Sequence, residues 1–285
     1  MTTAQTPKKP GVAERLAALE RAIHDRGSLL VAFSGGIDSS LIAAVGRRVL
    51  GPDHCQAAIG DSLSLPRREL EAARSLAQQL EIRLTVIEPT EQNDPNYQAN
   101  AGDRCFYCKS NLYEHLIPLA EQLGLAHIAN GTNLDDLGDH RPGLRAAREA
   151  SIVSPLVDAG LDKQDVRDIA RHLGLPNHDK PASACLASRI PYGTEVTPER
   201  LAQVEQAENA LADLGFTGFR VRHHDTIARI ELPIDQLPQI LDAELRERVS
   251  TALHDAGFTY IAIDLDGFRS GSGNILLTHN GNRLG

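Results

Sequence analysis

The feature that most constrains the fold is a repeated alternation of apolar, strand-like runs and helical stretches over the first 130 residues. Residues 28–33 form a continuous apolar run, typical of a strand buried on both faces, and a helical stretch at 41–50 follows it. The same order recurs, with strands expected at 56–59, 84–87 and 127–129 and helices at 12–23, 66–80 and 107–123. Such alternation is typical of a parallel sheet with helices on both faces, so we predict a doubly wound α/β fold.

A second, smaller unit is predicted after an irregular segment. Periodicity fails over 176–198, where Pro, Gly, Ser and Ala accumulate. A helix is then expected at 198–214, strands at 219–223 and 227–232, a helix at 237–256 and a strand at 260–265. We therefore predict a larger domain at 1–180, a linker at 181–197 and a smaller α-β-β-α-β domain at 198–285.

Composition narrows the possible partners. Twenty-nine basic and 38 acidic side chains give a net charge of −9, so nucleic acid is not the expected partner. No stretch approaches the roughly 18 apolar residues that cross a bilayer, and the N-terminus has no apolar signal core. We expect a cytoplasmic protein with a small-molecule substrate and no membrane partner.

The run Ser-Gly-Gly-Ile-Asp-Ser-Ser at 34–40 joins the first strand to its helix. Two glycines allow a tight turn whose N–H groups point inward, and hydroxyls and the helix N-terminus add donors for an anion. Asp38 would repel a bare phosphate, so we expect it to hold phosphate-bound Mg²⁺. The alternative is a plain strand-to-helix turn with capping residues. The predicted phosphate contacts are Ser34, Gly35, Gly36, Asp38, Ser39 and Ser40.

This run resembles the PP-loop of the ATP-pyrophosphatase superfamily, whose members cleave ATP between its α and β phosphates; the resemblance implies adenylation. A second turn, Asn-Gly-Thr-Asn at 130–133, follows the strand at 127–129 and would lie at the carboxyl edge of the same sheet. It resembles the Gly-Thr-Asn turn of PP-loop nucleotide pockets, which adds Gly131 and Thr132 to the expected site. An ordinary loop explains this turn equally well.

Cysteines supply the second candidate chemistry. Cys105 and Cys108 form a CxxC pair, Cys185 lies in the irregular segment, and Cys55 lies in a predicted buried strand and is assigned to the core. Arg189, four residues after Cys185, supplies a cation that would favour the thiolate form. Cys185 therefore suits a sulfur nucleophile.

Taken together, these motifs resemble the LarE family from about Ala13 to Asn274. The resemblance rests on the phosphate loop, the Gly-Thr-Asn turn, Cys-Leu-Ala-Ser-Arg-Ile-Pro-Tyr-Gly at 185–193, Arg-Val-Arg at 220–222 and Asp-Leu-Asp-Gly-Phe-Arg-Ser-Gly-Ser at 264–272. LarE proteins are ATP-dependent sulfur transferases that mature the nickel-pincer nucleotide cofactor of lactate racemase. The resemblance implies that a carboxylate of a pyridinium-dicarboxylate mononucleotide is adenylated and that a cysteine sulfur then displaces AMP.

The resemblance also implies roles for individual residues. Cys185 matches a cysteine that gives up its sulfur in some members, while CxxC places the chain in a three-cysteine branch thought to hold a [4Fe-4S] cluster through Cys105, Cys108 and Cys185. A zinc site, a redox pair or purely structural cysteines remain alternatives. The family also implies assembly into a homo-oligomer through the C-terminal domain.

Arginines of the second unit are the predicted substrate contacts. Arg220 and Arg222 are two apart in a strand and share a face, where they could bind a phosphate or carboxylate; a hairpin face with cross-strand ion pairs is the alternative. The resemblance favours substrate or phosphate binding by Arg189, Glu208, Arg220 and Arg222. His223 and His224 are expected at the surface.

Two other functions remain open. A PP-loop enzyme that thiolates tRNA would share the motifs, but the charge and only five lysines argue against it. A nucleotide sensor without catalysis would bind ATP and would be indifferent to the loss of Cys185.

Overall fold

The computed structural model describes residues 10–138, 142–181 and 183–269. It divides the chain into two compact units, each made from separate segments. Within the described residues, unit 1 comprises the chain up to Asp61, Arg67–Pro89 and Lys109–Ser183, and unit 2 comprises Ser62–Pro66, Thr90–Cys108 and the chain from Ala184 onward. Two short segments from the first half of the sequence thus belong to the same unit as the C-terminal elements.

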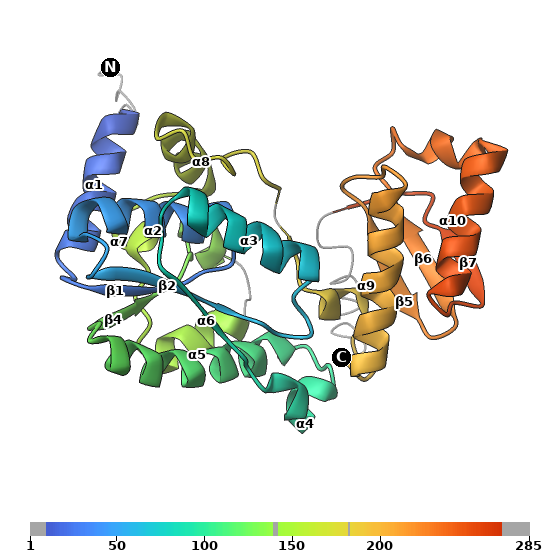
Figure 1. Ribbon diagram of the computed structural model, residues 1–285, viewed down its shortest axis with the longest axis horizontal. Coiled ribbons are helices and arrows are strands. Elements are labelled where there is room, and N and C mark those ends of the chain that lie inside the picture. The colour runs from blue at the N-terminus through green and yellow to red at the C-terminus, as the bar shows by residue number, and fades with distance from the viewer. Residues whose placement is uncertain (1–9, 139–141, 182, 270–285) are drawn as a thin grey trace, which may run out of the picture. The chain divides into compact units, whose positions relative to one another are not determined.

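Unit 1 is built on a four-stranded parallel sheet in the order β3-β2-β1-β4 (Figure 1). Leu29, Leu30 and Val31 of β1 are fully buried, as expected for a strand covered on both faces. Its strands are β1 (Leu29–Ala32), β2 (Cys55–Gly60), β3 (Leu84–Ile87) and β4 (His127–Ala129). The predicted parallel α/β fold is confirmed.

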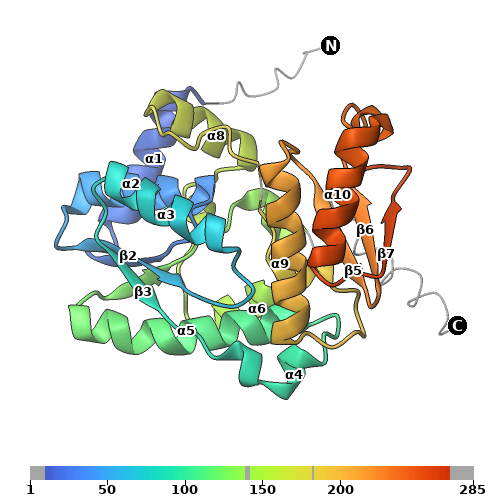
Figure 2. The same ribbon diagram turned by 45° about the vertical axis from the view of Figure 1, so that its right-hand side comes forward.

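Helices cover both faces of this sheet. In Figures 1 and 2, α2 and α3 lie on one side of it and α5 on the other. The helices that carry residues of unit 1 are α1 (Val12–His24), α2 (Ile37–Leu50), α3 (Arg67–Gln79), α5 (Arg104–Leu123), α6 (Pro142–Glu149), α7 (Pro155–Asp158) and α8 (Lys163–His172). Helix α5 begins in unit 2, so its first turn is treated with that unit.

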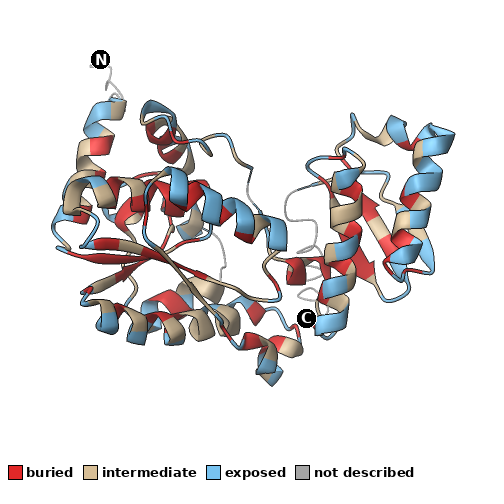
Figure 3. Cartoon of the chain, in the orientation of Figure 1, coloured by how far each residue is buried: buried red, intermediate tan, exposed pale blue. Residues whose placement is uncertain are grey.

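Unit 2 contains the predicted α-β-β-α-β arrangement. Its sheet has the order β5-β6-β7, with β5 and β6 antiparallel and β6 and β7 parallel. Val221, Ala228 and Ile230 face a core formed with α9 and α10, where the ribbon of Figure 3 carries the red of buried residues. Its regular elements are α4 (Pro95–Gln98), α9 (Pro198–Asp213), β5 (Arg220–His224), β6 (Ile227–Glu231), α10 (Ala243–Asp255) and β7 (Tyr260–Ile263).

Short 3₁₀ helices interrupt the connecting segments. They are η1 (Glu91–Asn93) and η3 (Leu186–Arg189) in unit 2, η2 (Leu134–Gly138) in unit 1, and η4 (Leu237–Leu241) before α10. One continuous helix was predicted at 237–256. Instead, Asp242 adopts an extended conformation and its carboxylate accepts the Leu245 N–H, so the chain stops one helix and starts another there. No helix in the described part of the chain is long and apolar enough to span a membrane.

Candidate functional site

The phosphate-binding candidate is the loop at 34–40, between β1 and α2 in unit 1. Gly35 has φ +66°, and a Cβ there would lie 2.8 Å from the Ala73 Cβ, so the position requires glycine. The buried hydroxyls of Ser39 and Ser40 donate to the Gly36 carbonyl at 3.2 and 2.8 Å. Hydrogen bonds within the loop therefore fix its conformation. The loop lies at the N-terminus of a 14-residue helix, a position suited to an anion.

The predicted second loop, at 130–133, lies against this one. Because β4 pairs with β1, both loops leave the same edge of the sheet, where the strand order reverses. A Cβ at Gly131 would lie 2.9 Å from the Asp38 Cβ and 3.0 Å from the Ser39 nitrogen, and the Asn133 Nδ2 donates to Asp38 Oδ1 at 3.2 Å. Thr132 is buried, and its N–H donates to Asn130 Oδ1. The structure brings the two loops together.

Asp38 has a partner that the sequence did not suggest. Lys163, the first residue of α8, places its Nζ 2.5 Å from Asp38 Oδ2. An ammonium thus faces the carboxylate that was expected to hold Mg²⁺. Within the described residues, no group of three or more His, Cys, Asp or Glu side chains is arranged to hold a metal ion. A single carboxylate is still compatible with Mg²⁺, because this ion takes most of its other ligands from phosphates and water.

The cysteines divide into one buried residue and three accessible ones. Cys55 lies in the unit 1 core, and burial raises the pKa of its thiol to about 12, which makes it unreactive. Cys105 is exposed, while Cys108 and Cys185 are half-buried; none of the four is in a disulfide. All three accessible cysteines belong to unit 2.

The CxxC pair occupies the first turn of a helix. Helix α5 begins at Arg104, three residues before the predicted start, and therefore includes both Cys105 and Cys108. Cys108 and Cys185 pack against one apolar cluster that contains Tyr97 and Leu186. Cys108 and Cys185 thus lie against the same core of unit 2, and the described residues contain no preformed metal site.

Arg104 ties the start of α5 to the segment that follows Cys185. Its buried guanidinium donates to the Ala187 carbonyl at 2.8 Å and to Asn100 Oδ1 at 2.5 Å. Burial lowers the pKa of Arg104, but the facing thiols of Cys185 and Cys105 and nearby phenols outweigh burial, so the net pKa is raised. A buried cation therefore lies among the sulfur atoms.

Asn100 also fixes the segment that follows Cys185. Its Nδ2 donates to the carbonyls of Ile190, Pro191 and Thr194 at 3.3, 2.9 and 2.8 Å. Cys185 itself precedes η3, and the Leu186 N–H donates to the Ser64 carbonyl at 2.8 Å. This irregular segment is consequently fixed by specific hydrogen bonds.

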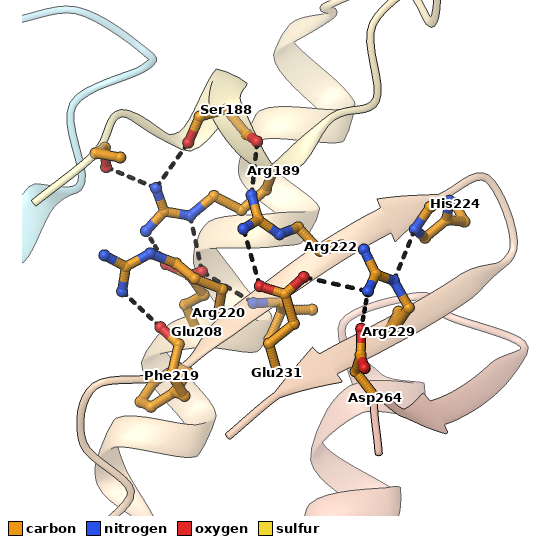
Figure 4. A network of polar contacts seen from close by, with 12 residues as sticks. Ser188, Arg189, Glu208, Phe219, Arg220, Arg222, His224, Arg229, Glu231 and Asp264 are labelled. Carbon is orange, nitrogen blue, oxygen red and sulfur yellow. Dashed lines mark hydrogen bonds and ion pairs between the residues drawn. The ribbon is translucent and has the colours of Figure 1, made fainter. Parts of the chain in front are cut away.

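The predicted substrate arginines form a buried network with carboxylates (Figure 4). Arg189 pairs with Glu208 through two contacts of 2.9 and 3.0 Å and also donates to the Cys185 carbonyl at 2.9 Å. Arg222 pairs with Glu231 at 2.8 Å and donates to the Ser188 carbonyl at 2.9 Å. The backbone around Cys185 is therefore bound by two of the predicted arginines.

Among the described residues of this network, four arginines meet three carboxylates. Arg189, Arg220, Arg222 and Arg229 face Glu208, Glu231 and Asp264. Burial lowers the pKa of Arg220, and Arg189 and Arg222 lower it further, with Glu208 and Glu231 acting in the opposite direction. An anion bound here would reduce the electrostatic repulsion between these arginines. The cross-strand pairing anticipated as an alternative is also present, since Arg222 and Glu231 lie on neighbouring strands.

The expectation for His223 was wrong. This side chain is buried, its Nε2 lies 3.0 Å from Gln203 Oε1, and its ring packs edge-on against Phe258. The alternation of β5 places Arg222 on one face and His223 on the core face. Of the predicted 264–272 motif, residues 270–272 lie outside the described part of the chain.

Comparison with known proteins decides the family. The chain is 40% identical over 267 residues to the pyridinium-3,5-bisthiocarboxylic acid mononucleotide synthase of Lactiplantibacillus plantarum, covering 94% of this chain and 96% of that protein. The chain belongs to this LarE-type synthase family. It is also 43% identical, over 93% of its length and 98% of the relative, to an uncharacterized protein of Synechocystis sp..

Two further comparisons cover only part of the chain. A family model described as NAD synthase matches residues 12–111, a range that includes the phosphate loop. A tRNA-specific 2-thiouridylase of Beijerinckia indica is 31% identical over 193 residues, which cover 54% of this chain and 44% of that enzyme. Unlike the LarE-type synthase, these relatives match only part of the chain.

Sequence reasoning on this LarE-type chain did not select several residues that touch the candidate sites. Asn133 was visible in the Asn-Gly-Thr-Asn turn, and Arg104 precedes the CxxC pair, so local patterns could have suggested both. Lys163 contacts a residue 125 positions away, and Glu231 on β6 contacts Arg222 on the adjacent strand β5. No local spacing indicates such contacts.

Proposed function

We propose that the chain is an ATP-dependent sulfur transferase that converts a carboxylate of pyridinium-3,5-biscarboxylic acid mononucleotide into a thiocarboxylate for the nickel-pincer cofactor. The observation that carries this proposal is the match to the Lactiplantibacillus plantarum synthase across almost the whole of both chains. That match includes the phosphate loop, the Cys185 segment and the arginine network. Each of them suits one part of the chemistry.

Activation of the carboxylate is the first step. A carboxylate oxygen attacks the α-phosphorus of ATP, the bond between the α-phosphorus and its bridging oxygen breaks, and pyrophosphate leaves. Donors of the 34–40 loop and the N-terminus of α2 would bind the phosphates, and Gly131 and Thr132 would line the same site. Asp38 would hold Mg²⁺ once phosphate oxygens provide its remaining ligands and Lys163 has moved to a phosphate.

Transfer of sulfur is the second step. The Cys185 thiolate attacks the acyl carbon of the adenylate and AMP leaves, which gives a thioester. Removal of the Cys185 α-proton would then break its Cβ–S bond, so that the thiocarboxylate departs and dehydroalanine remains. Arg189 and Ser188, which donate to the Cys185 carbonyl at 2.9 and 2.7 Å, would position this residue.

Binding of the anionic substrate is assigned to the network of Figure 4. The substrate carries a phosphate and two carboxylates, and the part of the network that the structure describes has more arginines than carboxylates. Arg220 and Arg222 offer charged donors on one face of β5, and Glu208 orients Arg189. These residues would hold the nucleotide while the carboxylate reacts.

In an alternative version of the second step Cys185 is not consumed, and Cys105, Cys108 and Cys185 would hold a [4Fe-4S] cluster. Their thiolate chemistry and common location fit such a group, although the described geometry is not that of a preformed site. A bound cluster would supply exchangeable sulfide. Iron analysis and the visible spectrum of protein prepared without oxygen test this assignment: about four irons per chain would support it, and a colourless, iron-free protein would contradict it.

Mass spectrometry tests the proposed reaction. We expect anaerobically prepared protein, given ATP, Mg²⁺ and the dicarboxylate nucleotide, to release pyrophosphate and to yield a product that has gained sulfur. Cys185→Ser should retain pyrophosphate release and lose sulfur transfer. Nucleotide binding without pyrophosphate release, together with an unchanged Cys185→Ser variant, would instead identify a sensor. If Cys185 is consumed, wild-type protein should become lighter by one H₂S and stop after one sulfur per chain.

A further inference from the structure

The segment that follows α8 contacts the phosphate loop within unit 1. Asn177 Nδ2 lies 3.0 Å from Ser40 Oγ and 3.3 Å from the Gly35 carbonyl oxygen. Lys180 Nζ lies 3.5 Å from the same carbonyl oxygen. Two side chains three residues apart therefore converge on one peptide group of the loop.

This contact fixes the orientation of the peptide bond between Gly35 and Gly36. In a trans peptide the carbonyl and the following N–H point in opposite directions. Because Asn177 and Lys180 hold the Gly35 carbonyl, the Gly36 N–H is directed away from them, where it meets Ser34 Oγ at 3.3 Å. A hydroxyl is a partner that a bound phosphate oxygen can replace, so the segment orients a donor of the loop.

Lys180 also brings a positive charge to the loop. Its Nζ forms an ion pair of 2.6 Å with Glu69, in the first turn of α3. About a quarter of each side chain is exposed, 23% for Lys180 and 27% for Glu69. An ion pair of this exposure contributes little to stability, and the lysine stem is flexible, so the ammonium can exchange its carboxylate for a more highly charged phosphate.

We propose that Lys180 is a pyrophosphate-binding residue of the 34–40 loop, held on Glu69 while the loop is empty, and that Asn177 positions the loop. This inference rests on the proposed function, since it concerns the ligand of the same loop.

If Lys180 exchanges Glu69 for phosphate, substitutions of these two residues should have opposite effects on pyrophosphate affinity. Removing the ammonium with Lys180→Met should weaken binding of inorganic pyrophosphate, with Mg²⁺ present, by about tenfold, the loss of one charge-assisted hydrogen bond. Lys180→Arg should restore most of the affinity. Glu69→Gln should leave the affinity intact or raise it, because it removes the carboxylate that competes with phosphate for the ammonium.

Titration calorimetry with pyrophosphate on the full-length chain measures these affinities, and thermal unfolding shows whether each variant is folded. Asp179→Asn is the matched control: it removes an exposed ion pair with Arg171 in the same segment, and its affinity should equal that of wild type. Equal losses of pyrophosphate affinity in Lys180→Met and Glu69→Gln would show that the ion pair only supports the structure, and would overturn the inference. An unchanged affinity in Lys180→Met would overturn it as well. A wild-type protein that fails to bind pyrophosphate would overturn the proposed function as well.

Discussion

Glu231 shows how strongly one side chain can matter to the arginine network. Its side chain is fully buried and pairs with Arg222 at 2.8 Å and Arg229 at 3.2 Å. Glu231→Gln keeps the shape but leaves an uncompensated buried positive charge, so we expect unfolding free energy to fall by about 3 kcal/mol. Urea denaturation measures this loss. Asp53→Asn, which removes an exposed pair with Arg83, should change stability by less than about 0.5 kcal/mol.

His223 makes stability depend on pH. Burial, followed by the charge of Arg200, lowers the pKa of its imidazole below the ordinary value of 6.5. The unfolded chain therefore binds a proton near pH 6.5, whereas the folded chain binds it only at lower pH. The stability that neutral His223 contributes is thus fully present above pH 6.5 and is lost as the pH falls below that value. Denaturation measured between pH 8 and pH 5 should show that the free energy of unfolding declines less steeply in His223→Gln than in the wild-type protein.

At the scale of elements, the approach of two loops at one sheet edge depends on Gly131. A Cβ there would lie within 3.0 Å of Asp38 and Ser39 atoms, and the clash involves backbone that cannot move freely. We expect Gly131→Ala to cost about 1–3 kcal/mol of stability, as overpacking does, and to weaken ATP binding. Gly138→Ala is the matched control, because a Cβ at Gly138 meets nothing within 4 Å. Equal ATP affinity in both variants would contradict this close packing.

The break between η4 and α10 is a second property of an element. Asp242 accepts the Leu245 N–H at 2.8 Å, so Asp242→Ala should cost about 1 kcal/mol, the usual effect of losing an N-cap. Thermal or urea unfolding measures the difference. Replacing the exposed Glu247 by alanine in the same helix should have a much smaller effect, and equal losses would show that Asp242 does not act as a cap.

Elements with strong periodicity were predictable, and contacts between distant segments were not. The apolar run before the phosphate loop predicted β1, and the two-residue alternation around Arg220 and Arg222 predicted β5. The continuous helix predicted at 237–256 was wrong because an apolar pattern can continue across a capping residue. No helix was predicted at 142–172, where α6, α7 and α8 occur, although α8 brings Lys163 to Asp38.

At the scale of the whole molecule, the candidate phosphate and sulfur chemistry lie in different units. The 34–40 loop, Asp38 and Lys180 belong to unit 1, whereas Cys105, Cys108 and Cys185 belong to unit 2. Unit 2 draws its cysteines from two stretches about 80 residues apart in the chain, and Cys105 and Cys185 both lie near Arg104. The sequence suggested a common role for these cysteines only through family resemblance, because spacing alone does not reveal which cysteines meet.

Net charge separates the proposed small-molecule transferase from an enzyme acting on tRNA. A tRNA-specific 2-thiouridylase matches about half of this chain, so shared motifs alone cannot distinguish the two substrates. Binding of tRNA requires clustered cations and weakens steeply with salt, whereas this chain carries a net charge of −9 and has only five lysines. We expect no gel shift of bulk tRNA between about 50 and 200 mM salt, while the dicarboxylate nucleotide binds in the same buffers. A tRNA complex that dissociates steeply over this range would instead favour tRNA thiolation, because counterion release is the signature of phosphate-backbone contacts.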